Sequence, residues 1–211
     1  MLEPKKFKAP FIKIDDIRAK ADAFRSKYWP SNIIPIDIFE LIEFELEIEI
    51  RPINNLREAG DVDALLLGDL KTIVVDQKDF LNERAENRLR FSMAHEVGHF
   101  VLHPDIFSKI QYSSVEEWID FFQEIPDDEY TWIEQHAYEF AGRLLVPREK
   151  LVERLDHSVS IAQTKGFDTW DSSGESTREY ISPGIARYFG VSEQVIEKRL
   201  IKEALWPPRK K

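Results

Sequence analysis

RFSMAHEVGHFVLH, at residues 90–103, is the most informative segment of this sequence. It contains the pattern H-E-x-x-H, in which His95 and His99 are four residues apart. On an α-helix, such residues lie one turn apart on the same face, so both imidazoles can reach one metal ion. Glu96 points away from that line and can act on a water molecule, as in zinc proteases. The alternatives are a helix whose histidines cap or pack, or an inactive fold of the zinc-protease type.

We expect this helix to begin at Asn82, a good capping residue, and to end before Pro104. Its apolar positions recur at helical spacing and predict one buried ridge, made by Leu89, Met93, Val97 and Val101. Ala94 and Gly98 allow close packing beside that ridge. His95 and His99 then lie at the margin of the buried face.

A second strong helix is predicted at residues 132–146, where Pro147 stops it. Its buried face consists of Ala137, Ala141, Leu144 and Leu145. Glu134 lies on the same face, one turn before Ala137. Because burying an unpaired charge is costly, this carboxylate needs a partner, and a metal ion would supply one.

A catalytic zinc takes three protein ligands and leaves a fourth position for water. Glu134 is the preferred third ligand, which predicts a His₂Glu site with one Zn²⁺ per chain; Glu139 and His136 remain as alternatives. His103 is excluded, because eight residues of helix separate it from His95 by about 12 Å. We expect His103 to support the ligands or to end the helix.

With these ligands, zinc would polarise the scissile carbonyl of a peptide, and Glu96 would serve as general base. Glu96 would take a proton from the attacking, metal-activated water and pass it to the leaving amine. Such sites commonly contain a second electrophile. The sequence leaves five candidates open for it: Tyr112, Tyr130, Tyr138, His136 and Arg143.

The rest of the chain predicts an α+β fold. Residues 43–50 alternate glutamate with apolar side chains, which is typical of a half-buried strand, ended here by Pro52. Residues 64–67 and 72–75 predict two more strands, joined by a tight turn at Gly68-Asp69. Together they indicate a small, twisted, mostly antiparallel sheet.

Further helices are expected at 15–28, from Pro35 onward, and after a capping box at Ser114. Another is expected at 149–163, with a break near Asp156-His157. Residues 182–204 have the pattern of a helix–turn–helix. Residues 105–131 form either a lid over the site or an ordinary surface insertion. We expect a single domain over residues 1–211. It comprises an N-terminal helical extension (1–34), a zincin-like core (35–165) and a helix–turn–helix-like element (178–205).

Composition limits the function. The 211 residues are 43% hydrophobic and 12% aromatic, which is enough for a real core. The chain contains no cysteine, so disulfides and thiolate zinc sites are excluded. The net charge of −10 opposes binding to nucleic acid. No signal-peptide pattern and no membrane-length apolar run occur, so we expect a cytoplasmic protein without membrane contact.

Two motifs resemble a known family. Residues 90–103 resemble the ImmA/IrrE-type metallopeptidase signature R-F-[ST]-x-A-H-E-[LIV]-G-H, followed by a hydrophobic run and a histidine. Residues 134–147, EQHAYEFAGRLLVP, resemble its second motif, E-x-x-A-N-x-F-A-x-x-L-L-M-P. The family's third zinc ligand is the first glutamate of that motif, which falls on Glu134. Tyr138 replaces the usual asparagine, Val146 replaces methionine, and the gap between the motifs is longer. Neither substitution removes a ligand.

The resemblance extends over roughly residues 35–200 and includes VSEQVIEKRL (191–200), which is similar to the family's helix–turn–helix element. It implies zinc-dependent cleavage of a regulatory protein inside the cell, often a helix–turn–helix repressor of mobile-element or stress genes. We expect that partner to be a separate protein. Two other functions remain: a non-catalytic sensor or protein-binding module, and a DNA-binding regulator that uses residues 182–204. Glu193 and Glu197 oppose DNA binding, because their carboxylates would meet phosphate unfavourably.

Overall fold

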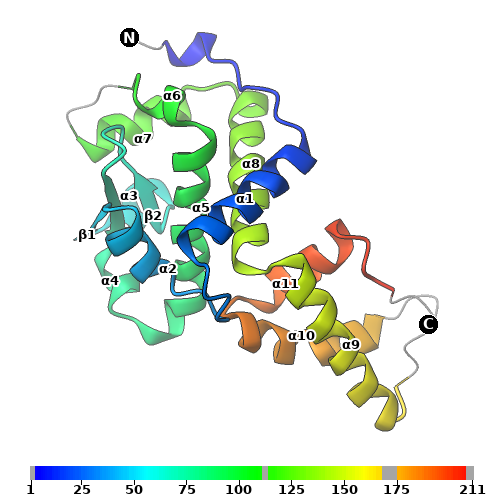
Figure 1. Cartoon of the computed structure of the whole chain (residues 1–211). Coiled ribbons are helices and arrows are strands. Elements are labelled where there is room, and N and C mark those ends of the chain that lie inside the picture. Colours follow the sequence, from blue (N-terminus) through cyan, green and yellow to red (C-terminus); the bar gives the residue numbers. More distant parts are fainter. Residues whose placement is uncertain (1–2, 111–113, 168–174, 208–211) are drawn as a thin grey trace.

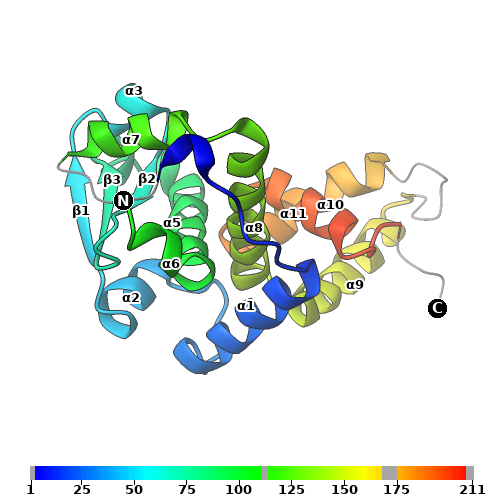
Figure 2. The ribbon, with the colours of Figure 1, turned by 90° about the horizontal axis from the view of Figure 1, so that it is seen from above.

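The computed structural model describes residues 3–110, 114–167 and 175–207. Two long helices, α5 (Glu86–Leu102) and α8 (Asp127–Leu145), lie side by side at its centre (Figures 1 and 2). A three-stranded sheet lies on the α5 side, and three C-terminal helices lie on the other. The expected mixture of helices and strands is confirmed. Among the described residues, no helix combines the length and the apolar character needed to cross a membrane.

The sheet has the order β1-β3-β2, with β1 at Glu49–Ile53, β2 at Ala64–Leu66 and β3 at Thr72–Asp76. β2 pairs with β3 antiparallel, but β1 pairs with β3 parallel. The prediction of a mostly antiparallel sheet was therefore wrong. Parallel neighbours need a crossover, and helix α3 (Leu56–Gly60) together with β2 returns the chain to the start of β3.

The strand predicted at residues 43–50 is also wrong. Helix α2 (Ile38–Glu40) continues into a π-helical turn, η2 (Leu41–Glu45). Phe44, on the apolar face of the predicted strand, is 74% exposed. The strand begins only at Glu49 and runs through Pro52, which is tolerated because β1 is an edge strand and needs no donor on its outer side.

Helix α5 follows the predicted pattern. Asn82 caps a short 3₁₀ turn, η3 (Glu83–Ala85), which leads directly into the helix. Leu89, Met93 and Val97 are buried as expected, whereas Val101 is partly exposed. The helix ends at Leu102, and Pro104 begins the next turn of helix, α6 (Pro104–Phe107).

Gly98 allows α5 and α8 to approach closely. A Cβ atom at this position would lie 3.0 Å from both the Cα and the carbonyl oxygen of Ala137 on α8. Both are backbone atoms, which cannot rotate away as a side chain can. The two central helices therefore approach closely because residue 98 has no side chain.

We expect Gly98→Ala to lower the free energy of unfolding by about 1–3 kcal/mol, because the added methyl group must push α5 and α8 apart. The matched control is Gly184→Ala in α10, where an added Cβ meets no atom within 4 Å. There, better helix propensity should raise stability by about 0.5–1 kcal/mol. Urea denaturation measures both changes. A Gly98→Ala protein as stable as the wild type would contradict the close-approach argument.

The remaining helices enclose this centre (Figure 1). Their bounds are α1 (Ile14–Tyr28), α4 (Gln77–Phe80), α7 (Val115–Gln123), α9 (Arg148–Thr164), α10 (Glu175–Phe189) and α11 (Glu193–Lys202), with a 3₁₀ turn η1 (Pro4–Lys6). Helix α9 is continuous, so the predicted break at Asp156-His157 was wrong. Two helices occupy residues 182–204, joined at Gly190 with φ +63° and capped at Ser192.

A buried network of ion pairs joins α1, α8 and α11. Glu139 of α8 accepts hydrogen bonds from Arg18 of α1 at 2.7 Å and from Arg199 of α11 at 2.9 Å. Lys202 lies 3.1 Å from its second oxygen. One turn along α8, Arg143 pairs with Asp22 and Glu203. The network holds an N-terminal and a C-terminal helix against the same face of α8.

Candidate metal centre

Three side chains from α5 and α8 converge on one point. His95 and His99 lie one turn apart on α5, and their Nε2 atoms are 3.0 Å apart. Glu134 of α8 approaches both, with one carboxylate oxygen 3.1 Å from His95 Nε2 and the other 3.2 Å from His99 Nε2. Within the described part of the chain, these three residues form the group whose potential ligand atoms all lie within 4.8 Å of one another.

The spacing of these atoms suits a tetrahedral ion. Zinc binds imidazole nitrogen and carboxylate oxygen at about 2.0–2.2 Å, which puts neighbouring ligands about 3.3–3.6 Å apart in a tetrahedron. Separations of 3.0–3.2 Å are only slightly shorter, so one ion can reach both imidazole nitrogens and the Glu134 carboxylate. Two imidazoles and one carboxylate are also a usual donor set for catalytic zinc. The residues present therefore fit a metal ion.

The electrostatics of the cluster are those of a carboxylate facing imidazoles. Burial alone would raise the pKa of Glu134, but the charges and hydrogen bonds of His95 and His99 hold that pKa well below its usual value. Burial alone would lower the pKa of His95, but Glu134 raises it. The carboxylate is thus kept ionised and aimed at the two ring nitrogens, which is the state that binds a cation.

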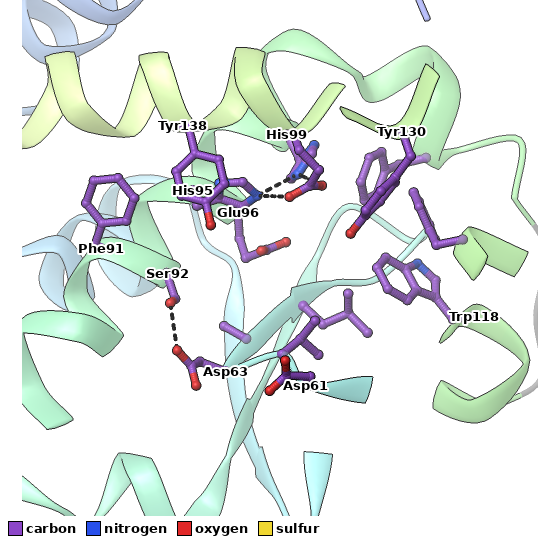
Figure 3. A pocket seen from close by; sticks show the side chains of 16 residues that line it. Asp61, Asp63, Phe91, Ser92, His95, Glu96, His99, Trp118, Tyr130 and Tyr138 are labelled. Atoms are coloured by element: carbon purple, nitrogen blue, oxygen red, sulfur yellow. Dashed lines mark hydrogen bonds and ion pairs between the residues drawn. The ribbon is translucent and has the colours of Figure 1, made fainter. Parts of the chain in front are cut away.

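Glu96 lies between the cluster and the sheet (Figure 3). One of its carboxylate oxygens accepts a hydrogen bond of 2.8 Å from the backbone N–H of Leu66 on β2. Burial raises the pKa of Glu96, against the opposing effects of the two histidines and the Leu66 N–H. A raised pKa suits a carboxylate that must accept and release a proton near neutral pH. The anchoring by Leu66 had no signal in the sequence.

A cavity of about 140 Å³ opens beside the cluster. Figure 3 shows Phe91 and Tyr138 on one side of the two imidazoles, and Trp118 and Tyr130 on the other. Phe107 and Phe122 complete the aromatic wall, and their rings are 5.7 Å apart. Segment 105–131, predicted as a lid or a surface insertion, thus supplies one wall of the cavity; residues 111–113 lie outside the described part.

The model of a known family matches residues 80–201, more than half of the chain, and carries the description Peptidase_M78, IrrE N-terminal-like domain. The chain belongs to this family. The expected resemblance is thereby confirmed, and it places the chain among peptidases. No curated protein matches the sequence.

In this member of the IrrE N-terminal-like family, two of the five candidate electrophiles line the cavity, Tyr130 and Tyr138. Burial raises the pKa of both phenols, and Glu134 raises it further, so both keep the proton that a hydrogen-bond donor needs. Arg143 is held in the ion-pair network, away from the cavity. His136 does not line the cavity, and Tyr112 lies outside the described residues.

The alternative third ligands lie elsewhere. Glu139 is turned away from His95 and His99 into the ion-pair network. His136 is buried, and its ring stacks on that of His103. His103 itself contacts the far nitrogen of His99, with 3.1 Å between the two Nδ1 atoms. Neither His103 nor His136 belongs to the cluster.

Proposed function

We propose that this protein is a zinc-dependent endopeptidase that acts in the cytoplasm and cleaves a regulatory protein, a helix–turn–helix transcriptional repressor. The observation that carries the proposal is the convergence of His95, His99 and Glu134 next to Glu96, in a cavity beside an edge strand. We propose further that the sheet, α5 and α8 form a zincin-like core. In this reading α10 and α11 are a helix–turn–helix-like element that packs against the core.

His95, His99 and Glu134 would hold one Zn²⁺. When bound, zinc supplies a Lewis acid that polarises a peptide carbonyl and lowers the pKa of a water molecule. Glu96 accepts a proton from the attacking water and later delivers it to the nitrogen of the leaving amine. The Leu66 N–H keeps one oxygen of Glu96 occupied, so the proton is carried on the other. Tyr130 or Tyr138 donates a hydrogen bond to the carbonyl oxygen as it gains negative charge.

Strand β2 offers the substrate a backbone to pair with. The Asp63 carbonyl and the Leu67 N–H bond to β3, at 2.9 Å each. Because hydrogen-bonding direction alternates along an antiparallel strand, the backbone groups of Ala64 and Leu66 face away from β3. The Leu66 N–H is already bonded to Glu96, so pairing with a substrate would use the backbone groups of Ala64. Ala64 and Leu65 line the cavity. An extended peptide can therefore add to β2 and lie across the cluster.

A protein substrate fits the site better than nucleic acid does. Asp61 and Asp63 line the cavity, and carboxylates repel phosphate. On α11, Glu193 is exposed, and Arg199 is buried in ion pairs with Glu139 and Glu203. The exposed cations of that helix are Lys198 and Lys202, and Lys202 is paired with Glu139, so the helix presents no concentrated positive charge to DNA.

Metal content tests the site directly. Protein purified without chelator should contain about one zinc per chain, and His95→Ala should lose it. Zinc at 100 times its Kd should stabilise the wild type by about 2.7 kcal/mol, and a chelator should remove that gain. His157→Ala is the control, because His157 is exposed on α9 and far from α5 in sequence. Metal retained in full by His95→Ala would contradict the ligand assignment.

Cleavage tests the substrate. The zinc-loaded protein is incubated with each helix–turn–helix protein that is found encoded beside its gene, and fragments are identified by mass spectrometry. The proposal expects one or a few cuts by the wild type, and none after chelation. Tight binding of the repressor without any cut would instead support a non-catalytic binding module on the same fold.

A further inference from the structure

Three buried histidines form a continuous series that starts at the metal centre. His99 Nδ1 lies 3.1 Å from His103 Nδ1, and His103 Nε2 lies 3.3 Å from His136 Nδ1. All three rings are buried, and His103 is only 1% exposed. The series joins the end of α5 to the middle of α8. Four of the chain's five histidines are thus connected, since His95 contacts His99 through Nε2.

Metal binding by His99 determines where the protons of this series lie. A neutral imidazole has one protonated and one lone-pair nitrogen, and the lone pair binds the metal. Because the His99 Nε2 faces His95 and Glu134, its proton must be on Nδ1, which then donates to His103. His103 Nδ1 accepts, so its own proton is on Nε2 and is donated to His136 Nδ1. Every hydrogen bond points away from the cluster.

We propose that His103 is a positioning residue for the metal: it accepts the Nδ1 proton of His99 and so keeps the Nε2 lone pair aimed at the ion. His136 positions His103 in the same way. The inference rests on the proposed metal site. Partners that orient a metal-binding histidine through its second nitrogen typically change metal affinity by about 10- to 100-fold.

The surroundings of His103 leave His99 with few other means of orientation. The Phe107 ring packs against the His99 ring, with centroids 5.0 Å apart, and limits its tilt. Phe107 has no acceptor, so it cannot select which nitrogen is protonated. His103 Nδ1 is the acceptor that keeps the proton of His99 on Nδ1. It is held in place because the His103 backbone N–H donates to the His99 carbonyl at 2.9 Å, one helical turn back.

Two amide substitutions separate positioning from packing. In His103→Asn the side-chain oxygen takes the place of Nδ1 and can still accept from His99. In His103→Gln the amide lies near the place of Nε2, so it can contact His136 but leaves His99 without an acceptor. Both variants have similar polarity. His157→Ala, on the exposed surface of α9, serves as the control.

Each protein is stripped of metal, checked for folding by circular dichroism, and titrated with Zn²⁺ in competition with a chromophoric chelator. The Co²⁺ absorption spectrum of each loaded protein reports the ligand geometry. We expect His103→Gln to lose about 10- to 100-fold in affinity, with an altered Co²⁺ spectrum. His103→Asn and His157→Ala should stay close to the wild type. If neither amide variant folds, His136→Leu is titrated instead, and a smaller loss is expected.

Equal affinity of wild type and His103→Gln would overturn the inference. So would equal losses in the two amide variants, because packing alone would then explain them. Unchanged affinity in His136→Leu would overturn the role of His136. A wild-type protein that binds no Zn²⁺ would instead overturn the proposed function itself, and the two failures are therefore distinguishable.

Discussion

Replacing Glu96 with glutamine should lower the rate constant of peptide cleavage by about 10²- to 10⁴-fold, the usual contribution of a general base. Zinc affinity should change little, because the cluster of His95, His99 and Glu134 is untouched. Glutamine has nearly the shape of glutamate, and its carbonyl can still accept the Leu66 N–H. The substitution therefore removes the proton acceptor and leaves the architecture.

The same substitution should not lower the free energy of unfolding of the metal-free protein. Burial raises the pKa of Glu96 in the folded metal-free protein, so the ionised carboxylate costs free energy at neutral pH. That cost is absent below the pKa of the unfolded chain and grows as the pH rises above it. At pH 7, metal-free Glu96→Gln should thus be at least as stable as the wild type.

Steady-state kinetics on the identified substrate and urea denaturation of the metal-free proteins measure the two effects. Glu86→Gln, an exposed position in the first turn of the same helix, is the control for both. Cleavage at the wild-type rate by Glu96→Gln would remove Glu96 from the mechanism. Lost activity together with lost zinc would mean that Glu96 maintains the site and does not act as the base.

Glu139→Gln should lower the free energy of unfolding by about 3–5 kcal/mol, because it removes one partner from a buried ion-pair network. Glu139 and Arg199 are each only 3% exposed. The network sets six cations against four carboxylates: Arg18, Arg25, Arg143, Arg148, Arg199 and Lys202 against Asp22, Glu139, Glu149 and Glu203. Without the Glu139 charge, the excess of buried positive charge grows.

The effect should depend on pH. Burial alone would raise the pKa of Glu139, but the Arg18 hydrogen bond and the Arg199 and Lys202 charges hold it below its usual value. A lowered pKa contributes stability that is complete above the unfolded value of about 4.3 and is lost as the pH falls through the folded value. The difference between wild type and Glu139→Gln should therefore shrink in acid.

Thermal unfolding at several pH values tests this. A loss of 3–5 kcal/mol corresponds to a fall in Tm of about 6–20 °C for a chain of this size. Lys202→Met is the matched control, because Lys202 contacts the same carboxylate but is 44% exposed, and such pairs contribute about 0–1 kcal/mol. A Glu139→Gln protein within 1 kcal/mol of the wild type would show that the network adds little to stability.

The helices around the site could be predicted because their signals are local. The apolar spacing on α5 and α8, the stop at Pro147 and the lone acid at Glu134 each follow from helix geometry. The structure brings Glu134 to the two histidines as the shared-face argument predicts. The sequence did not predict the first turn of α8, which begins at Asp127. The acidic residues there suit a helix N-terminus but also suit a loop.

The sheet could not be predicted as well, because strand pairing is decided by distant residues. Alternating glutamates at 43–50 have the period of a strand, yet Leu41 and Ile42 are buried on a helical turn instead. Nothing local distinguishes a parallel β1 from an antiparallel one. The burial of Glu139 and of His136 also depends on partners that are distant in sequence. Glu139 is buried against Arg18 and Arg199, and His136 is buried against His103.

The ion-pair network has a consequence for dissecting the chain. The region shared with the family, 80–201, contains all three cluster residues but not Arg18, Asp22 or Glu203, which neutralise charges on α8 and α11. It also excludes Leu66, which anchors Glu96. A fragment cut at those limits would keep the motifs and lose the counter-charges. The matched region is therefore smaller than the set of residues that pair with the charges of α8 and α11 and anchor the site.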